Sequence, residues 1–157
     1  MFNLNLLPST ADNTYRGSRL ALWFFIAIVC LMTWRSVIHM FFEQYGMHDI
    51  ANFIVLSGDP DPMPIIYMFF SLWGLAQLIF CGMSWVVILR YKSLIPLMFI
   101  FWLTEWSVRL FVYPFMEKSV VDGGIYTSGM TPGAAGAPYV VFLLIIFLIL
   151  STREKVK

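Results

Sequence analysis

Residues 20–42 read LALWFFIAIVCLMTWRSVIHMFF, a run in which Arg35 is the only formal charge. A helix crosses the roughly 30 Å of bilayer hydrocarbon with about 20 mostly apolar residues, because it rises about 1.5 Å per residue. The run therefore predicts a membrane-spanning helix. Arg16 and Arg19 precede it, as in a signal peptide, but no small-x-small cleavage pattern follows, so we expect the helix to be retained.

The composition of the whole chain agrees with a membrane location. Of its 157 residues, 60% are hydrophobic and only 12% are charged. Soluble domains average about 45–50% apolar and about 25% charged residues. A net charge of +1 offers no basic surface for nucleic acid. These values exclude an ordinary soluble enzyme and a nucleic-acid binder, and they predict an integral membrane protein whose first partner is the lipid bilayer.

Three further runs reach span length, at residues 65–89, 94–113 and 132–151. We therefore predict an all-α fold, an antiparallel four-helix bundle that forms a single domain over residues 1–157. Helices in lipid associate through close backbone approach, which small residues permit. The expected helix-packing residues are Gly74, Gly82, Gly133, Gly136 and Ala137.

Basic residues predict the orientation of the four spans. Seven of them flank span ends on one side of the predicted bundle, whereas only Lys118 falls in a loop on the other side. Cytoplasmic segments near span ends carry the excess of Lys and Arg, so both termini are predicted to be cytoplasmic, in a plasma (inner) membrane. The seven residues are Arg16, Arg19, Arg90, Lys92, Arg153, Lys155 and Lys157.

The first outer loop, residues 46–64, predicts a short helix on the membrane surface. Asp49 suits the N-cap of such a helix, Gly58 suits its end, and apolar residues between them fall on one face. Asp59 and Asp61, each followed by proline, then form a stiff acidic link into the second span. With Asp49, they make up the acidic residues of the outer loop.

Polar side chains inside the spans are the strongest functional signal in the sequence. Counted from the nearest flanking basic residue, Arg35, Gln77 and Glu105 all lie roughly 20–24 Å along their helices, in the outer half of the bilayer. A charge there costs about 2.5–3.5 kcal/mol on insertion scales, so such groups must face one another or water. We name the predicted set the polar cluster: Arg35, His39, Glu43, Gln77, Glu105 and Arg109.

Two functions fit the polar cluster. In the first, which the sequence favours, an ion-pair network fixes the helices or docks another membrane-protein subunit, and the protein is a non-catalytic accessory or assembly subunit of a larger complex. In the second, the protein is a carrier or lipid-modifying protein. Arg35 and Arg109 outnumber the one buried carboxylate of Glu105, so the outward-facing pocket would bind an anionic head group of a lipid or small molecule.

No catalytic or cofactor-binding set is recognisable in the sequence. A haem between spans needs paired histidines, but His39 is the only histidine within a span. A metal site would need His39 and Glu43 to meet His48 and Asp49, and we expect no such site. No catalytic Ser-His-Asp set and no phosphate-binding glycine loop is present. We therefore expect no cofactor and no metal, and the sequence favours a non-catalytic protein over an enzyme.

Overall fold

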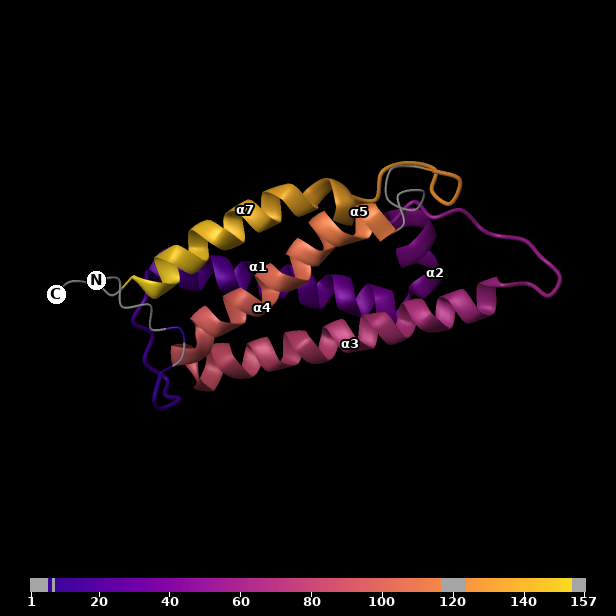
Figure 1. The fold of residues 1–157 in the computed structure, drawn as a ribbon. Coiled ribbons are helices and arrows are strands. Elements are labelled where there is room, and N and C mark those ends of the chain that lie inside the picture. The colour runs from indigo at the N-terminus through magenta and orange to yellow at the C-terminus, as the bar shows by residue number, and fades with distance from the viewer. Residues whose placement is uncertain (1–5, 7, 117–123, 154–157) are drawn as a thin grey trace.

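The computed structural model describes residues 6, 8–116 and 124–153, and four helices long and apolar enough to span a membrane make up most of it (Figure 1). The first two are α1 (Arg19–Phe41) and α3 (Met63–Arg90). The third begins with a short 3₁₀ turn (Lys92–Leu94) and runs through α4 (Ile95–Ser107), a π-helical turn (Val108–Val112) and α5 (Tyr113–Met116). The fourth is α7 (Pro132–Thr152). The predicted four-helix bundle is confirmed.

The ends of the four apolar stretches fall within two residues of those predicted, and the third continues as a helix through α5 to Met116. Local capping explains two of the starts. The Ser18 hydroxyl accepts a hydrogen bond from the Leu20 amide at 3.3 Å, and the Thr131 hydroxyl accepts one from the Ala134 amide at 3.4 Å. Pro132 follows Thr131 at the first helical position, where its missing N–H costs nothing.

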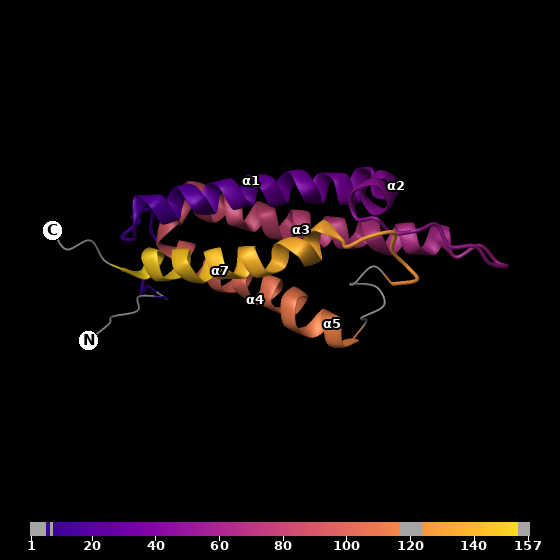
Figure 2. The ribbon, with the colours of Figure 1, turned by 90° about the horizontal axis from the view of Figure 1, so that it is seen from above.

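The bundle is built from two helix pairs. Helix α1 packs chiefly along α3, and α7 packs chiefly along α4, whereas α1 and α7 touch less (Figure 2). Large apolar side chains fill the space between the pairs. The most buried of them include Phe25, Met32, Phe99, Trp102 and Leu144.

At one end of the bundle, which we call the basic end, α1 begins, α3 turns into α4, and α7 finishes. The segment before α1 ties these elements together, since the Ser18 amide donates to the Leu150 carbonyl at 3.0 Å and Ser93 exchanges hydrogen bonds with the Asp12 backbone. Basic residues of the described chain gather at this end: Arg16, Arg19, Arg90, Lys92 and Arg153. Lys118, Lys155 and Lys157 lie outside the described residues.

The opposite end, which we call the loop end, contains the short helix expected in the first outer loop. This helix comprises α2 (Glu43–Tyr45) and a π-helical turn (Gly46–Ile50), so it ends almost where it was expected to begin. The predicted bounds at Asp49 and Gly58 are therefore wrong. Asn52, at φ 61°, turns the chain out of the helix, and its carbonyl accepts a hydrogen bond from the Ser128 amide at 2.8 Å.

The predicted packing residues differ in what they contact. A Cβ atom on Gly74 would lie 2.6–2.9 Å from His39 and Met40, so this glycine allows α3 to approach the backbone of α1. Ala137 is fully buried. No atom lies within 4 Å of the Cβ position on Gly82 or Gly136, so these two glycines do not mark helix contacts.

Candidate functional site

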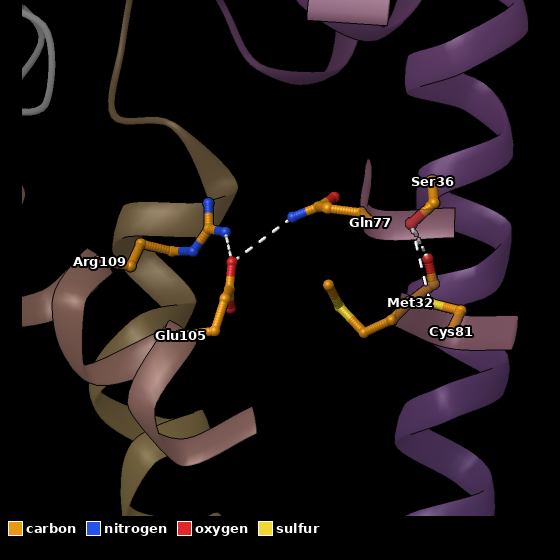
Figure 3. A network of polar contacts seen from close by, with 6 residues as sticks. All are labelled: Met32, Ser36, Gln77, Cys81, Glu105 and Arg109. Carbon is orange, nitrogen blue, oxygen red and sulfur yellow. Dashed lines mark hydrogen bonds and ion pairs between the residues drawn. The ribbon is translucent and has the colours of Figure 1, made fainter. Parts of the chain in front are cut away.

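Three residues of the polar cluster form a hydrogen-bonded chain across two helices (Figure 3). Arg109, in the π-helical turn after α4, makes an ion pair with Glu105 one turn earlier. The Gln77 amide on α3 donates to the same Glu105 oxygen at 3.4 Å. The spacing of Glu105 and Arg109, four residues apart with the acid first, is the favourable order for an ion pair on a helix.

Arg35 approaches this chain through an aromatic ring rather than through a carboxylate. Its guanidinium carbon lies 5.3 Å from the centre of the Trp73 ring, and that of Arg109 lies 5.5 Å from the centre of the same ring. Each cation–π contact contributes about 0.5–2 kcal/mol, depending on how far it is desolvated. Among the described residues the pair of Arg109 with Glu105 is the only ion pair, so the charge of Arg35 has no carboxylate partner there.

His39 lies one turn beyond Arg35 on α1 and is only 3% exposed. Its ring centre lies 4.6 Å from that of Phe70 and 4.9 Å from that of Trp73, both on α3. The close approach at Gly74 holds the backbone of His39 against α3. The ring is thus fixed between two aromatic side chains beside the guanidinium groups.

Glu43, also expected in the polar cluster, does not join it. Helix α1 ends at Phe41, and Phe42 adopts φ −135° and ψ 50°, which interrupts the helical spacing that would have continued the stripe. Glu43 instead lines a separate hollow with His48 and Asp49. The structure therefore brings together the other five residues of the cluster.

The predicted acidic residues of the outer loop also lie apart from the cluster. Asp49, Asp59 and Asp61 are exposed. The Asp61 carboxylate accepts a hydrogen bond from the Met63 amide at 3.0 Å, which caps the start of α3. The described residues contain no group of three or more His, Cys, Asp or Glu that could hold a metal ion.

A cavity of about 370 Å³ lies at the loop end, and Arg35, His39 and Arg109 all contribute to its wall. Its volume is in the range typical of small-molecule sites. Gly133, on the first turn of α7, faces both guanidinium groups, since a Cβ there would lie 3.7 Å from a terminal nitrogen of each. We call this space the head-group cavity. Its lining also includes Trp73, Gly133, Ile50, Phe53 and Thr131.

Buried polar atoms around the cavity have hydrogen-bonding capacity to spare. Three nitrogen atoms, Arg35 Nη1, Arg109 Nε and His39 Nδ1, are buried and have no hydrogen-bond partner among the described residues, and the same holds for the oxygen atoms Glu105 Oε2 and Gln77 Oε1. Leaving such a group unpaired costs about 1–3 kcal/mol, and more for a charged one. Two guanidinium groups face one carboxylate here, so the site carries excess positive charge. That charge suits the binding of a phosphate or carboxylate.

Two features of the site were not expected from the sequence. Trp73 connects Arg35 with Arg109, and Trp106 lies beneath Arg109, with 5.0 Å between the guanidinium carbon and the ring centre. The position of Trp73, one turn before Gln77 on the same face of α3, is the signal that could have identified it. Two π-helical turns also flank the cavity, which is a common location for such turns at functional sites.

Comparison with protein-family models, with curated proteins and with solved structures finds no match for this chain. The fold and the site of this chain are therefore known from its own geometry alone. They describe a multi-pass membrane protein whose four-helix bundle holds a cationic cavity at its loop end.

Proposed function

We propose that this protein binds an anionic molecule in the head-group cavity, through the phosphate or carboxylate group of that molecule. One observation carries the proposal: Arg35 and Arg109 meet at the Trp73 ring beside one cavity, while Glu105 neutralises only one of them. A bound anion would neutralise the remaining charge and accept hydrogen bonds from the guanidinium groups of Arg35 and Arg109, which line the cavity. Guanidinium groups suit this role, because their planar donors match two oxygens at once.

The direction from which the ligand arrives is part of the same proposal. The described basic residues at the basic end support a cytoplasmic location for that end, by the excess of Lys and Arg on cytoplasmic segments. The head-group cavity lies at the opposite end and is rimmed by loop residues. The protein would therefore take its ligand from the outer side of a plasma membrane, as a carrier or a lipid-modifying protein does.

The accessory-subunit function rests on the same unbalanced charge. A carboxylate on a helix of a neighbouring subunit could neutralise Arg35 in place of a small anion. This second candidate predicts that mild-detergent purification brings a stoichiometric partner protein with the chain. The Arg35→Gln variant would then lose that partner.

Thermal unfolding in an uncharged detergent tests the first candidate. Glycerol 3-phosphate should raise the unfolding temperature by mass action, whereas uncharged glycerol at the same concentration should not. The Arg35→Gln variant should lose this response. Arg90→Gln is the matched control, because it removes an exposed cation at the basic end and should keep the response. No response in the unaltered protein, or an equal response in Arg35→Gln, would contradict the proposal.

A further inference from the structure

A second cavity, of about 400 Å³, lies between α1 and α7. We call it the α1–α7 groove. It shares five lining residues with the head-group cavity, so the two spaces adjoin: Arg35, His39, Ile50, Pro132 and Gly133. One ligand could therefore extend from the cationic cavity into the groove.

The walls of the groove are apolar away from Arg35 and His39. Helix α1 contributes Ala27 and Leu31, and helix α7 contributes Val140 and Leu143. The groove follows α1 from Arg35 back to Phe24, a distance of roughly 16 Å at the rise of an α-helix. That length is about half of the hydrocarbon thickness.

The helix arrangement explains why the groove exists. Since α1 packs on α3 and α7 packs on α4, the contact between α1 and α7 is looser than the contact within either pair. At the loop end, hydrogen bonds join the two outer loops across the bundle, from Ser128 to Asn52 at 2.8 Å and from Ile54 to Tyr126 at 3.1 Å. The loops are thus tied above the cavity, while the groove lies along two membrane-spanning helices.

We infer that the ligand is an anionic lipid, whose head group lies between Arg35 and Arg109 and whose acyl chain lies in the α1–α7 groove. The inference rests on the proposed function and adds the chain and its path from the bilayer. Charge complementarity selects the head group, and the apolar walls select the chain.

Binding measurements with three probes test the inference on the purified full chain in an uncharged detergent. The probes are oleoyl lysophosphatidic acid, glycerol 3-phosphate and uncharged monoolein. We expect the lysophosphatidic acid to bind at least about a hundredfold more tightly than glycerol 3-phosphate, because only the former buries a chain. Monoolein should bind far more weakly than lysophosphatidic acid, because it lacks the anionic group.

A variant that fills the groove separates the chain from the head group. Ala27→Trp should weaken lysophosphatidic acid binding at least about tenfold and leave glycerol 3-phosphate binding unchanged. Ala76→Trp is the matched control: Ala76 is exposed on α3 and lies outside the groove, so this variant should bind as the unaltered protein does. Leu143→Trp on the opposite wall repeats the test if Ala27→Trp does not fold.

The possible failures have distinct signatures. If both groove variants bind lysophosphatidic acid normally while Arg35→Gln does not, the chain lies elsewhere and the inference is overturned, but the proposed function stands. If Arg35→Gln binds both phosphates normally, the proposed function fails together with the inference. A partner protein that copurifies with the chain and blocks lysophosphatidic acid binding would also overturn the inference.

Discussion

Neutralising Arg35 and neutralising Arg109 should change the stability of the protein in opposite directions. Both guanidinium groups lie beside the Trp73 ring, but only Arg109 has a carboxylate partner among the described residues. Arg109→Gln therefore leaves the Glu105 carboxylate unpaired inside the bundle. Arg35→Gln instead removes a cation whose charge has no such partner.

The magnitudes follow from burial and from the contacts that each variant loses. The side chains of Arg109 and Glu105 are 10% and 28% exposed. Breaking a buried ion pair costs about 3–5 kcal/mol, and the partial exposure of Glu105 places Arg109→Gln near about 3 kcal/mol of destabilisation. Arg35→Gln recovers about 2.5–3.5 kcal/mol of insertion cost and loses about 0.5–2 kcal/mol of cation–π energy. The net result for Arg35→Gln is a gain of about 0.5–3 kcal/mol.

Reversible unfolding of both variants in the same uncharged detergent, without added anion, measures this difference. The double variant Glu105→Gln/Arg109→Gln is the control, because it removes both charges of the pair. It should recover most of the stability that Arg109→Gln loses. Our account of the site would be refuted if Arg35→Gln destabilised the protein as much as Arg109→Gln does.

Two further predictions concern the helix contact and the orientation. Gly74→Ala should destabilise the bundle by about 1–3 kcal/mol, because the added Cβ would clash with the α1 backbone. Gly82→Ala should not destabilise it, because the space at that position is open. Thermal unfolding of the two variants measures the difference. In intact cells, cysteines at Asp61 and Ser128 should react with an impermeant thiol reagent added outside, and one at Arg153 should not. The reverse pattern would invert the proposed orientation.

The sequence predicted the spans well, because hydropathy and capping are local properties. Thr131 and Pro132 mark the start of α7 in the sequence and in the structure. Contacts between distant segments could not be read in the same way. Asn52 has a positive φ and its carbonyl pairs with the second outer loop, and the short helix ends at Ile50, near the start of the predicted region.

The polar cluster was predicted in part for a similar reason. Counting residues along a helix gives the depth of a side chain in the membrane, and this count predicted a similar depth for Arg35, Gln77 and Glu105. The depth of a side chain does not determine which neighbouring helix it faces, so the contact of Trp73 with two guanidinium groups was not predicted. Glu43 was assigned to the cluster on the assumption of a continuous helix, which Phe42 interrupts.

Arg35 and Arg109 are proposed to share one water-accessible cationic cavity. A cysteine at Gly133 reports on it directly, because its Cβ would lie 3.7 Å from both guanidinium groups without a clash. The reaction rate of this cysteine is measured with two methanethiosulfonate reagents, the anionic sulfonatoethyl and the cationic trimethylammonioethyl compound. Each rate is divided by the rate at which the same reagent reacts with a free thiol. Cys30 and Cys81 are replaced by alanine in all variants.

We predict that the anionic reagent is favoured by at least about tenfold at Gly133→Cys, because the net charge acts at short range in a low dielectric. Arg35→Gln should remove that preference. A cysteine at the exposed Ser57 is the control and should show no preference for the anion. Equal rates of the two reagents at Gly133→Cys, or a preference that survives Arg35→Gln, would contradict the account.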